Sequence, residues 1–163
     1  MAIVYLSLGS NMGDRMANLK VALNLLENKG LKIVKKSGVF ETEPVGMKEQ
    51  HDFYNMCVEA ELNMPAEALL TIINMTEFEM GRTKQEHWGP RIIDIDILFY
   101  SNIIIYSLEL MVPHPEIEKR KFVLEPLSEI ASGFKHPVNG LTIKELLNKG
   151  DFKEHTQRIG ELS

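Results

Sequence analysis

The sequence predicts an α+β fold in one domain, with an antiparallel sheet packed between helices. Three observations support this prediction. The 163 residues suffice for one domain with a substantial core. Short runs of apolar and β-branched residues are separated by segments whose apolar positions follow helical spacing. No repeat, low-complexity tract or linker divides the chain, so we expect residues 1–163 to form a single domain.

The first part of the chain predicts the order strand, helix, strand, strand. Residues 3–8 are apolar and β-branched, and they end at a turn that begins with Gly9. Asp14 is a suitable N-cap for a helix over residues 14–29. Residues 31–40 and 53–62 predict the second and third strands, which a polar loop containing Pro44 separates.

The second part continues with a helix and a strand. The helix is expected to begin near Pro65 and to end by Gly81. Residues 91–100 predict a strand that a turn at Ser101 would pair with residues 103–106. Two further helices, over residues 119–130 and 143–149, are expected to be the last elements of the chain. The order β-α-β-β-α-β predicts a ferredoxin-like core with additions at its C-terminal end.

Composition and charge narrow the classes of function. The hydrophobic fraction of 44% and the charged fraction of 25% are those of a soluble globular protein. A net charge of −5 gives no basic field to attract nucleic acid, so an anionic ligand would need a local basic cluster. The single cysteine, Cys57, excludes an internal disulfide. No apolar run is long enough to cross a bilayer and no signal segment is visible, so a cytoplasmic protein without a membrane partner is expected.

The most informative stretch contains two aspartates, Asp94 and Asp96, on a predicted strand. Side chains alternate along a strand, so both carboxylates would share one face, with Cα atoms about 6.5–7 Å apart. Such a pair can hold one hard cation, or two about 3.5–4 Å apart. The same pattern also occurs where acids merely alternate with core residues on a solvated strand.

Neighbouring basic residues favour the metal interpretation. Arg82, Lys84 and Arg91 lie within a few residues of the aspartates. A nucleoside triphosphate requires carboxylates that hold magnesium and, beside them, guanidinium groups that neutralise phosphate charge. The sequence has no P-loop, so phosphates are not held by that device.

Aromatic and polar residues elsewhere suggest a site for a planar heterocycle. Trp88 lies in a polar segment, where its ring could stack on a ligand or tuck onto the domain. Asn55 could offer a donor and an acceptor to a heterocycle edge, or serve as a strand-entry residue. His114, Arg120 and Phe122 add a basic group and an aromatic ring, although such a charge run also occurs on solvated helix faces. Four histidines without ligand-like spacing are expected at the surface: His51, His87, His136 and His155.

These residues fall into ordered blocks that resemble the 6-hydroxymethyl-7,8-dihydropterin pyrophosphokinase family. The resemblance runs from about Tyr5 to Ala131. The blocks are Leu8-Gly9-Ser10-Asn11, Thr42-x-Pro44-x-Gly46, Phe53-Tyr54-Asn55, Gly81-Arg82, Trp88-Gly89-Pro90-Arg91-x-x-Asp94-x-Asp96, Val112-Pro113-His114 and Pro126-Leu127. The block around Trp88 is the most specific of them.

The resemblance implies an ATP- and magnesium-dependent diphosphotransferase of folate biosynthesis that releases AMP. Asp94 and Asp96 would bind two Mg²⁺ ions, and Arg82 and Arg91 would assist the transfer. The pterin would lie between Trp88 and Phe122. The other implied pterin contacts are Thr42, Val45, Phe53 and Asn55. The implied ATP contacts are Glu77, Lys84, Arg91, Ile97, His114 and Arg120. The family's fold is a ferredoxin-like sheet between helices, and its members are usually monomers.

The sequence departs from the family pattern in the segment before Trp88. His87 occupies a position that is often arginine, and Lys84 matches the second basic residue of that segment only approximately. Loop closure and ATP affinity are the properties that these changes would alter. Glu109, Met111 and Pro115 also differ from the side chains that some relatives have near the nucleotide.

Two other functions remain open at this point. A metal-dependent nucleotidyltransferase or cyclase also places paired aspartates on a ferredoxin-like sheet, but it would release pyrophosphate instead of AMP and would not need Trp88 and Phe122. A regulatory module that binds a small ligand would bind it without Asp94 or Asp96. The identity of the released product and the dependence on the aspartates distinguish the three.

Overall fold

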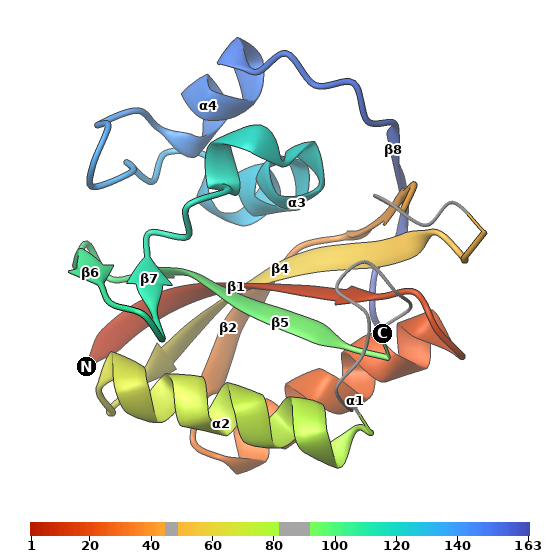
Figure 1. The fold of residues 1–163 in the computed structure, drawn as a ribbon, viewed down its shortest axis with the longest axis horizontal. Helices are drawn as coiled ribbons and strands as arrows, with labels where there is room; N and C mark the ends of the chain where they lie inside the picture. Colours follow the sequence, from red (N-terminus) through yellow and green to blue (C-terminus); the bar gives the residue numbers. More distant parts are fainter. Residues whose placement is uncertain (45–48, 82–91) are drawn as a thin grey trace.

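The computed structural model of the chain describes residues 1–44, 49–81 and 92–163. One sheet forms the middle layer, with helices on both of its faces (Figure 1). The helices α1 (Arg15–Asn28) and α2 (Ala66–Glu79) cover one face. The helices α3 (Lys121–Ala131) and α4 (Ile143–Lys149) cover the other, and a short 3-10 helix, η1 (Ile117–Lys119), precedes α3. This architecture confirms the predicted α+β fold with a sheet between helices.

The sheet has the strand order β5-β1-β4-β3-β8, and β2 also pairs with β4. All of these pairs are antiparallel. The strands are β1 (Ala2–Ser10), β2 (Lys32–Lys36), β3 (Val39–Thr42), β4 (Phe53–Leu62), β5 (Asp94–Tyr100) and β8 (Thr156–Gly160). A separate pair joins β6 (Ile105–Tyr106) to β7 (Met111–Val112). Because β1 lies between β5 and β4, residues far apart in sequence meet across three adjacent strands.

Two apolar cores flank the sheet. On the α1 and α2 side, residues such as Leu6, Leu8 and Ile95 pack together and are almost completely buried. On the α3 and α4 side, Phe99 and Leu124 belong to a second buried cluster. The predicted site residues Asn55, Asp94 and Asp96 lie on this second side of the sheet.

Local signals determine several boundaries as predicted. The Asp14 side chain accepts a hydrogen bond from the Ala17 N–H at 3.1 Å and so caps α1. The strand predicted over residues 53–62 is β4 without change. The helix expected from Pro65 is α2, and the two helices expected after it are α3 and α4.

The predicted strand over residues 31–40 is two strands. The Ser37 hydroxyl accepts a hydrogen bond from the Cys57 N–H at 2.9 Å, and the Gly38 N–H donates to Glu129 at 2.7 Å. The Ser37 N–H still donates to the Cys57 carbonyl at 2.9 Å, but the other contacts interrupt the regular ladder at residues 37–38. The strands β2 and β3 therefore pair separately with β4. A side chain–backbone interaction of this kind leaves no periodic signal in the sequence.

Four other expectations were wrong. The first strand does not end at a turn that begins with Gly9, because Gly9 and Ser10 still pair with β4 as part of β1. Residues 103–106 do not pair with the strand before them, because β6 pairs with β7 while β5 uses β1. The chain does not end after its last helix, because β8 returns to pair with β3. His136 is not at the surface: it is 7% exposed, its ring lies edge-on to Phe99, and its Nδ1 accepts the Val138 N–H at 3.2 Å. His51 and His155 are exposed as predicted, and His87 lies outside the described residues.

Candidate active site

Asp94 and Asp96 begin β5 and share the face of the sheet that α3 and α4 cover. In the register with β1, Asp94 lies opposite Gly9 and Asp96 lies opposite Ser7. The intervening Ile95 is 5% exposed and packs in the core on the α1 and α2 side. The predicted alternation is therefore present, with the carboxylates on one face and the isoleucines on the other.

Asp96 lies beside two residues that the sequence assigned to a nucleotide site. Its Oδ2 is 3.7 Å from Nη1 of Arg120 and 4.0 Å from Nε2 of His114. Arg120 immediately precedes α3, and its guanidinium lies 5.6 Å from the ring centroid of Phe122. The fold therefore brings together an acid from β5, a basic residue at the start of α3, and an aromatic ring in the first turn of that helix.

His114 is held in place by its backbone and by one ring nitrogen. Its N–H donates to the carbonyl of Leu98 at 3.0 Å, which ties the segment after β7 to β5. A cis peptide bond joins Val112 to Pro113 just before it. The Nδ1 atom accepts the Glu116 N–H at 3.1 Å, so the neutral ring carries its hydrogen on Nε2, facing Asp96.

The imidazole of His114 is neutral near pH 7. Burial lowers its pKa to about 4, and repulsion from Arg120 acts in the same direction, while Glu116 and Asp94 oppose both effects. Arg120 therefore supplies a positive charge next to Asp96, whereas His114 supplies a neutral hydrogen-bond donor.

Thr42 and Asn55 form a buried polar pair on the same face. Thr42 is 2% exposed and Asn55 is 8% exposed. The Asn55 Nδ2 donates to the Thr42 Oγ1 at 3.2 Å. Asn55 lies opposite Gly9 in β1, so it is two strands away from Asp94 along one row of the sheet. The predicted heterocycle residues and the predicted metal residues thus lie on adjoining parts of one surface.

The two predicted aromatic residues in the described ranges also lie near this surface. Phe53 is on β4, two positions before Asn55, so both side chains leave the strand on the same side. Phe122 packs at the margin of the second core. The Sγ of Cys57 is 3.6 Å from the carbonyl of Val123, which places the first turn of α3 over β4 close to Asn55.

Glu77 and Ile97 lie on the other side of the sheet. Ile97 is 5% exposed, and its side chain packs in the core on the α1 and α2 side. Glu77 is on α2, and its carboxylate contacts the backbone of β5. Neither side chain shares the face that carries Asp94 and Asp96. Any contact of Ile97 with a ligand on that face would come from its backbone.

Five predicted residues lie outside the described residues: Val45, Arg82, Lys84, Trp88 and Arg91.

The donor set suits magnesium bound together with a substrate. Among the residues that the structure describes, no group of three His, Cys, Asp or Glu side chains is arranged to hold a metal ion. Mg²⁺ is usually bound by one or two carboxylates together with substrate phosphates and water. Asp94 and Asp96 meet that requirement, because both present oxygen ligands on one strand face.

Sequence reasoning missed two residues that support the site. Gly9 lies between Asn55 and Asp94 in the strand register. It could have been noticed, because it is part of a block that resembles the family. Glu154 accepts the backbone N–H of Lys121 at 2.7 Å and so caps the first turn of α3. No local pattern signals that contact, since 33 residues separate the partners.

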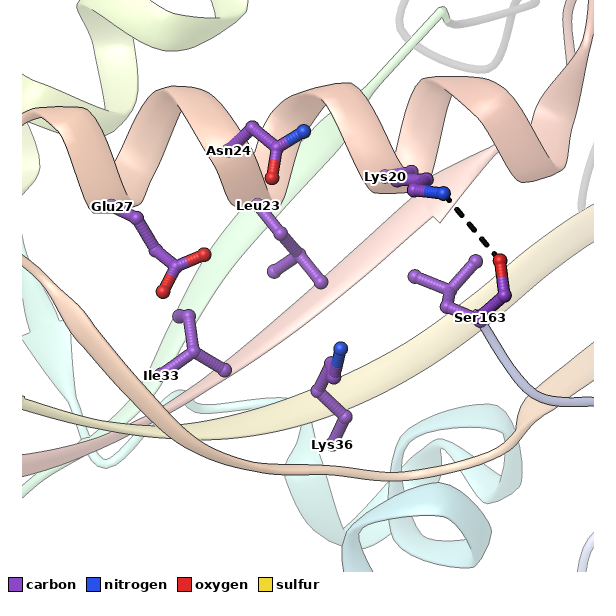
Figure 2. Close-up of a pocket in the computed structure, with 8 residues that line it drawn as sticks. Lys20, Leu23, Asn24, Glu27, Ile33, Lys36 and Ser163 are labelled. Atoms are coloured by element: carbon purple, nitrogen blue, oxygen red, sulfur yellow. Dashed lines mark hydrogen bonds between the residues drawn. The ribbon is translucent and has the colours of Figure 1, made fainter.

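A pocket lies elsewhere, between α1, β2 and the end of the chain (Figure 2). Lys20 and Glu27 from α1 face Ile33 and Lys36 from β2 across it. The Lys20 Nζ lies 3.4 Å from the hydroxyl of Ser163. None of the predicted site residues lines this pocket.

In the ranges that the structure describes, no helix has the length and apolar character needed to cross a membrane.

Comparisons with known proteins agree with the resemblance. The chain is 43% identical over 129 residues to the 2-amino-4-hydroxy-6-hydroxymethyldihydropteridine pyrophosphokinase of Bacillus subtilis, covering 78% of this chain and 77% of that protein. It is 41% identical over 153 residues to the Aquifex aeolicus protein of the same name, covering 94% and 95%. It is also 41% identical to the folic acid synthesis protein fol1 of Pneumocystis carinii, of which it spans 20%.

Solved structures share the fold. A crystal structure of an HPPK-DHPS protein in complex with substrates superimposes with a TM-score of 0.72 at 18% identity, covering 90% of this chain and 43% of that chain. The wild-type HPPK-DHPS of Plasmodium falciparum gives a TM-score of 0.68 at 22% identity, with 91% and 43% covered. The chain thus spans less than half of these longer proteins. Residues 5–132 match the family of 7,8-dihydro-6-hydroxymethylpterin-pyrophosphokinase (HPPK), and the chain belongs to that family.

Proposed function

We propose that this chain transfers pyrophosphate from ATP to 6-hydroxymethyl-7,8-dihydropterin and releases AMP, as a step of folate biosynthesis. One structural observation supports this function most directly. The paired aspartates and the buried Thr42–Asn55 pair lie on one face of adjacent strands, separated by Gly9. A metal–phosphate site beside a site for a polar heterocycle is the arrangement that such a transfer requires.

Asp94 and Asp96 would hold two Mg²⁺ ions, and such ions would supply positive charge to neutralise the phosphates of ATP. Arg120 lies next to Asp96 and would add a positive charge beside the phosphates. The neutral His114 would donate from Nε2 to a phosphate or ribose oxygen. Lys84 and Ile97 would contribute to the nucleotide site, Ile97 through its backbone. Glu77 would contribute by holding the backbone of β5 between the two aspartates.

The pterin would be recognised by its polar edge and by its flat faces. Asn55 can offer a carbonyl and an amide to that edge, with Thr42 holding the amide in place. Val45 would add backbone contacts, and Phe53 would line the site. Trp88 and Phe122 would stack on the two faces of the ring.

In the reaction, the hydroxymethyl oxygen of the pterin would attack the β-phosphorus of ATP, and the bond to the α-phosphate oxygen would break to release AMP. Arg82 and Arg91 would stabilise charge on the transferring group. The protein's main contribution would be to orient the two substrates and exclude water.

We also propose that the chain acts as a single-domain monomer in the cytoplasm, with small molecules as its partners and no nucleic acid.

Product analysis tests the proposal. Protein incubated with ATP, Mg²⁺ and the dihydropterin should form AMP and a pyrophosphorylated pterin in equal amounts. Release of pyrophosphate without a pterin product would favour a nucleotidyltransferase. Asp96→Asn keeps the side-chain shape but removes the charge, and it should reduce turnover by about 100-fold or more while leaving the circular dichroism spectrum unchanged. Turnover at the wild-type rate in this variant would exclude the metal assignment.

A further inference from the structure

We propose that Gly9 is a positioning residue for the pterin site: its lack of a side chain sets where the Asn55 amide can lie. This inference rests on the proposed function. Gly9 occupies the middle of a three-strand row, with Asn55 of β4 on one side and Asp94 of β5 on the other. Cross-strand partners point to the same face, so a side chain at position 9 would enter the space between these two residues.

The space above Gly9 is too small for a methyl group. A Cβ built on Gly9 would lie 2.7 Å from Oδ1 of Asn55 and 3.5 Å from Cδ1 of Phe53. The first distance is shorter than van der Waals contact, whereas the second is ordinary contact. The third-nearest atom, at 3.8 Å, also belongs to Asn55, so Asp94 is not among the close neighbours. The conflict is therefore specific to the Asn55 amide.

Asn55 cannot easily move away. Its side chain is held by the hydrogen bond to Thr42 and is 8% exposed. Rotating the amide away from a new Cβ would lengthen or break that bond and redirect the edge that we assign to the pterin. The displaced group would remain in a buried setting, where a lost hydrogen bond is costly.

The requirement for glycine here is one of space. Five glycines of the described residues have positive φ angles that favour glycine, and Gly9 is not one of them. Alanine can therefore adopt the backbone of position 9, and Gly9→Ala tests the close approach alone.

The expected result is a selective loss of pterin affinity. Gly9→Ala should raise the KM for the dihydropterin about tenfold, the effect of one misplaced hydrogen bond, with the KM for ATP within about twofold of wild type. Gly133→Ala is the matched control, because a Cβ at Gly133 meets nothing within 4 Å and its φ is not positive. That variant should behave as wild type.

A double-mutant cycle shows whether Gly9 acts through Asn55. If it does, Gly9→Ala should raise the KM for the dihydropterin less than twofold in an Asn55→Ala background, because the clashing atom is gone. Equal effects in both backgrounds would overturn the inference, as would an unchanged KM in the single variant. If Gly9→Ala fails to fold, recovery of folding in the double variant supports the clash, and failure of both overturns it.

The two proposals can fail separately. Wild-type protein that forms no AMP would refute the proposed function. Wild-type protein that forms AMP, together with a Gly9→Ala variant whose pterin KM is unchanged, would refute only the role of Gly9.

Discussion

The carboxylate of Glu77 accepts a hydrogen bond from the backbone N–H of Ile95, with 2.9 Å between Oε2 and N. Ile95 separates Asp94 from Asp96. Among the strands that the structure describes, β5 is the outermost, with β1 as its neighbour in the strand order. The hydrogen bond therefore holds β5 in place at Ile95, between the two aspartates, on the edge of the strand that faces away from β1. A residue of α2 on one side of the sheet thus supports the strand that carries both acids on the other.

Glu77→Ala is expected to lower the free energy of unfolding by about 1–3 kcal/mol, because it leaves the buried Ile95 N–H without this acceptor. Urea denaturation followed by circular dichroism measures the change. Glu77→Gln is the matched control, since its amide oxygen can still accept the bond, and it should lose less. An alanine variant as stable as wild type would show that the contact contributes nothing.

Removing Glu154 should loosen the start of α3. Glu154→Ala takes away the side chain that caps the Lys121 N–H, and N-cap losses typically cost about 1 kcal/mol. Because Arg120 and Phe122 flank that position, the KM for the dihydropterin should also rise. Glu161→Ala is the control: Glu161 pairs with Arg158 at the exposed surface, where such pairs contribute little. Equal effects of the two substitutions would contradict a specific role for Glu154.

His136 should make stability depend on pH. Burial lowers the pKa of His136 below its ordinary value of 6.5, although Glu118 opposes the shift. The unfolded chain then binds a proton at higher pH than the folded chain. The contribution of neutral, buried His136 to the free energy of unfolding is therefore fully present above about pH 6.5, and it is lost as the pH falls below that value.

Urea denaturation at pH 7.5 and 5.5 measures this effect, and the free energy of unfolding should decrease less in His136→Asn than in wild type. The Asn carbonyl can replace Nδ1 as the acceptor of the Val138 N–H. His155→Asn, at an exposed position, should keep the wild-type dependence. If both variants respond to pH as wild type does, His136 is not the responsible group.

The Cys57 thiol should be unreactive in the folded protein. It is completely buried, and burial raises its pKa well above the usual range, so little thiolate is present at neutral pH. A thiol-specific disulfide reagent should modify it only after denaturation. Modification in native buffer at the rate of the denatured chain would contradict this expectation. The same measurement reports whether the other variants are folded.

The sequence by itself determined the elements whose signals are local. Asp14 caps α1 through an atom three residues away, β4 has the alternating run predicted for it, and Asp94 and Asp96 share a face because strand geometry requires it. The ordered blocks of residues also indicated the family, and the match over residues 5–132 confirmed it.

The tertiary structure alone decided the relationships between distant segments. The pairing of β8 with β3, the cap that Glu154 gives to α3, and the burial of His136 each join parts of the chain with no shared local pattern. Gly9 belongs to a block that the sequence shows, but its place between Asn55 and Asp94 appears only when β1 lies between β4 and β5. Local periodicity reports which face a residue occupies, whereas strand order and register decide which other residues share that face.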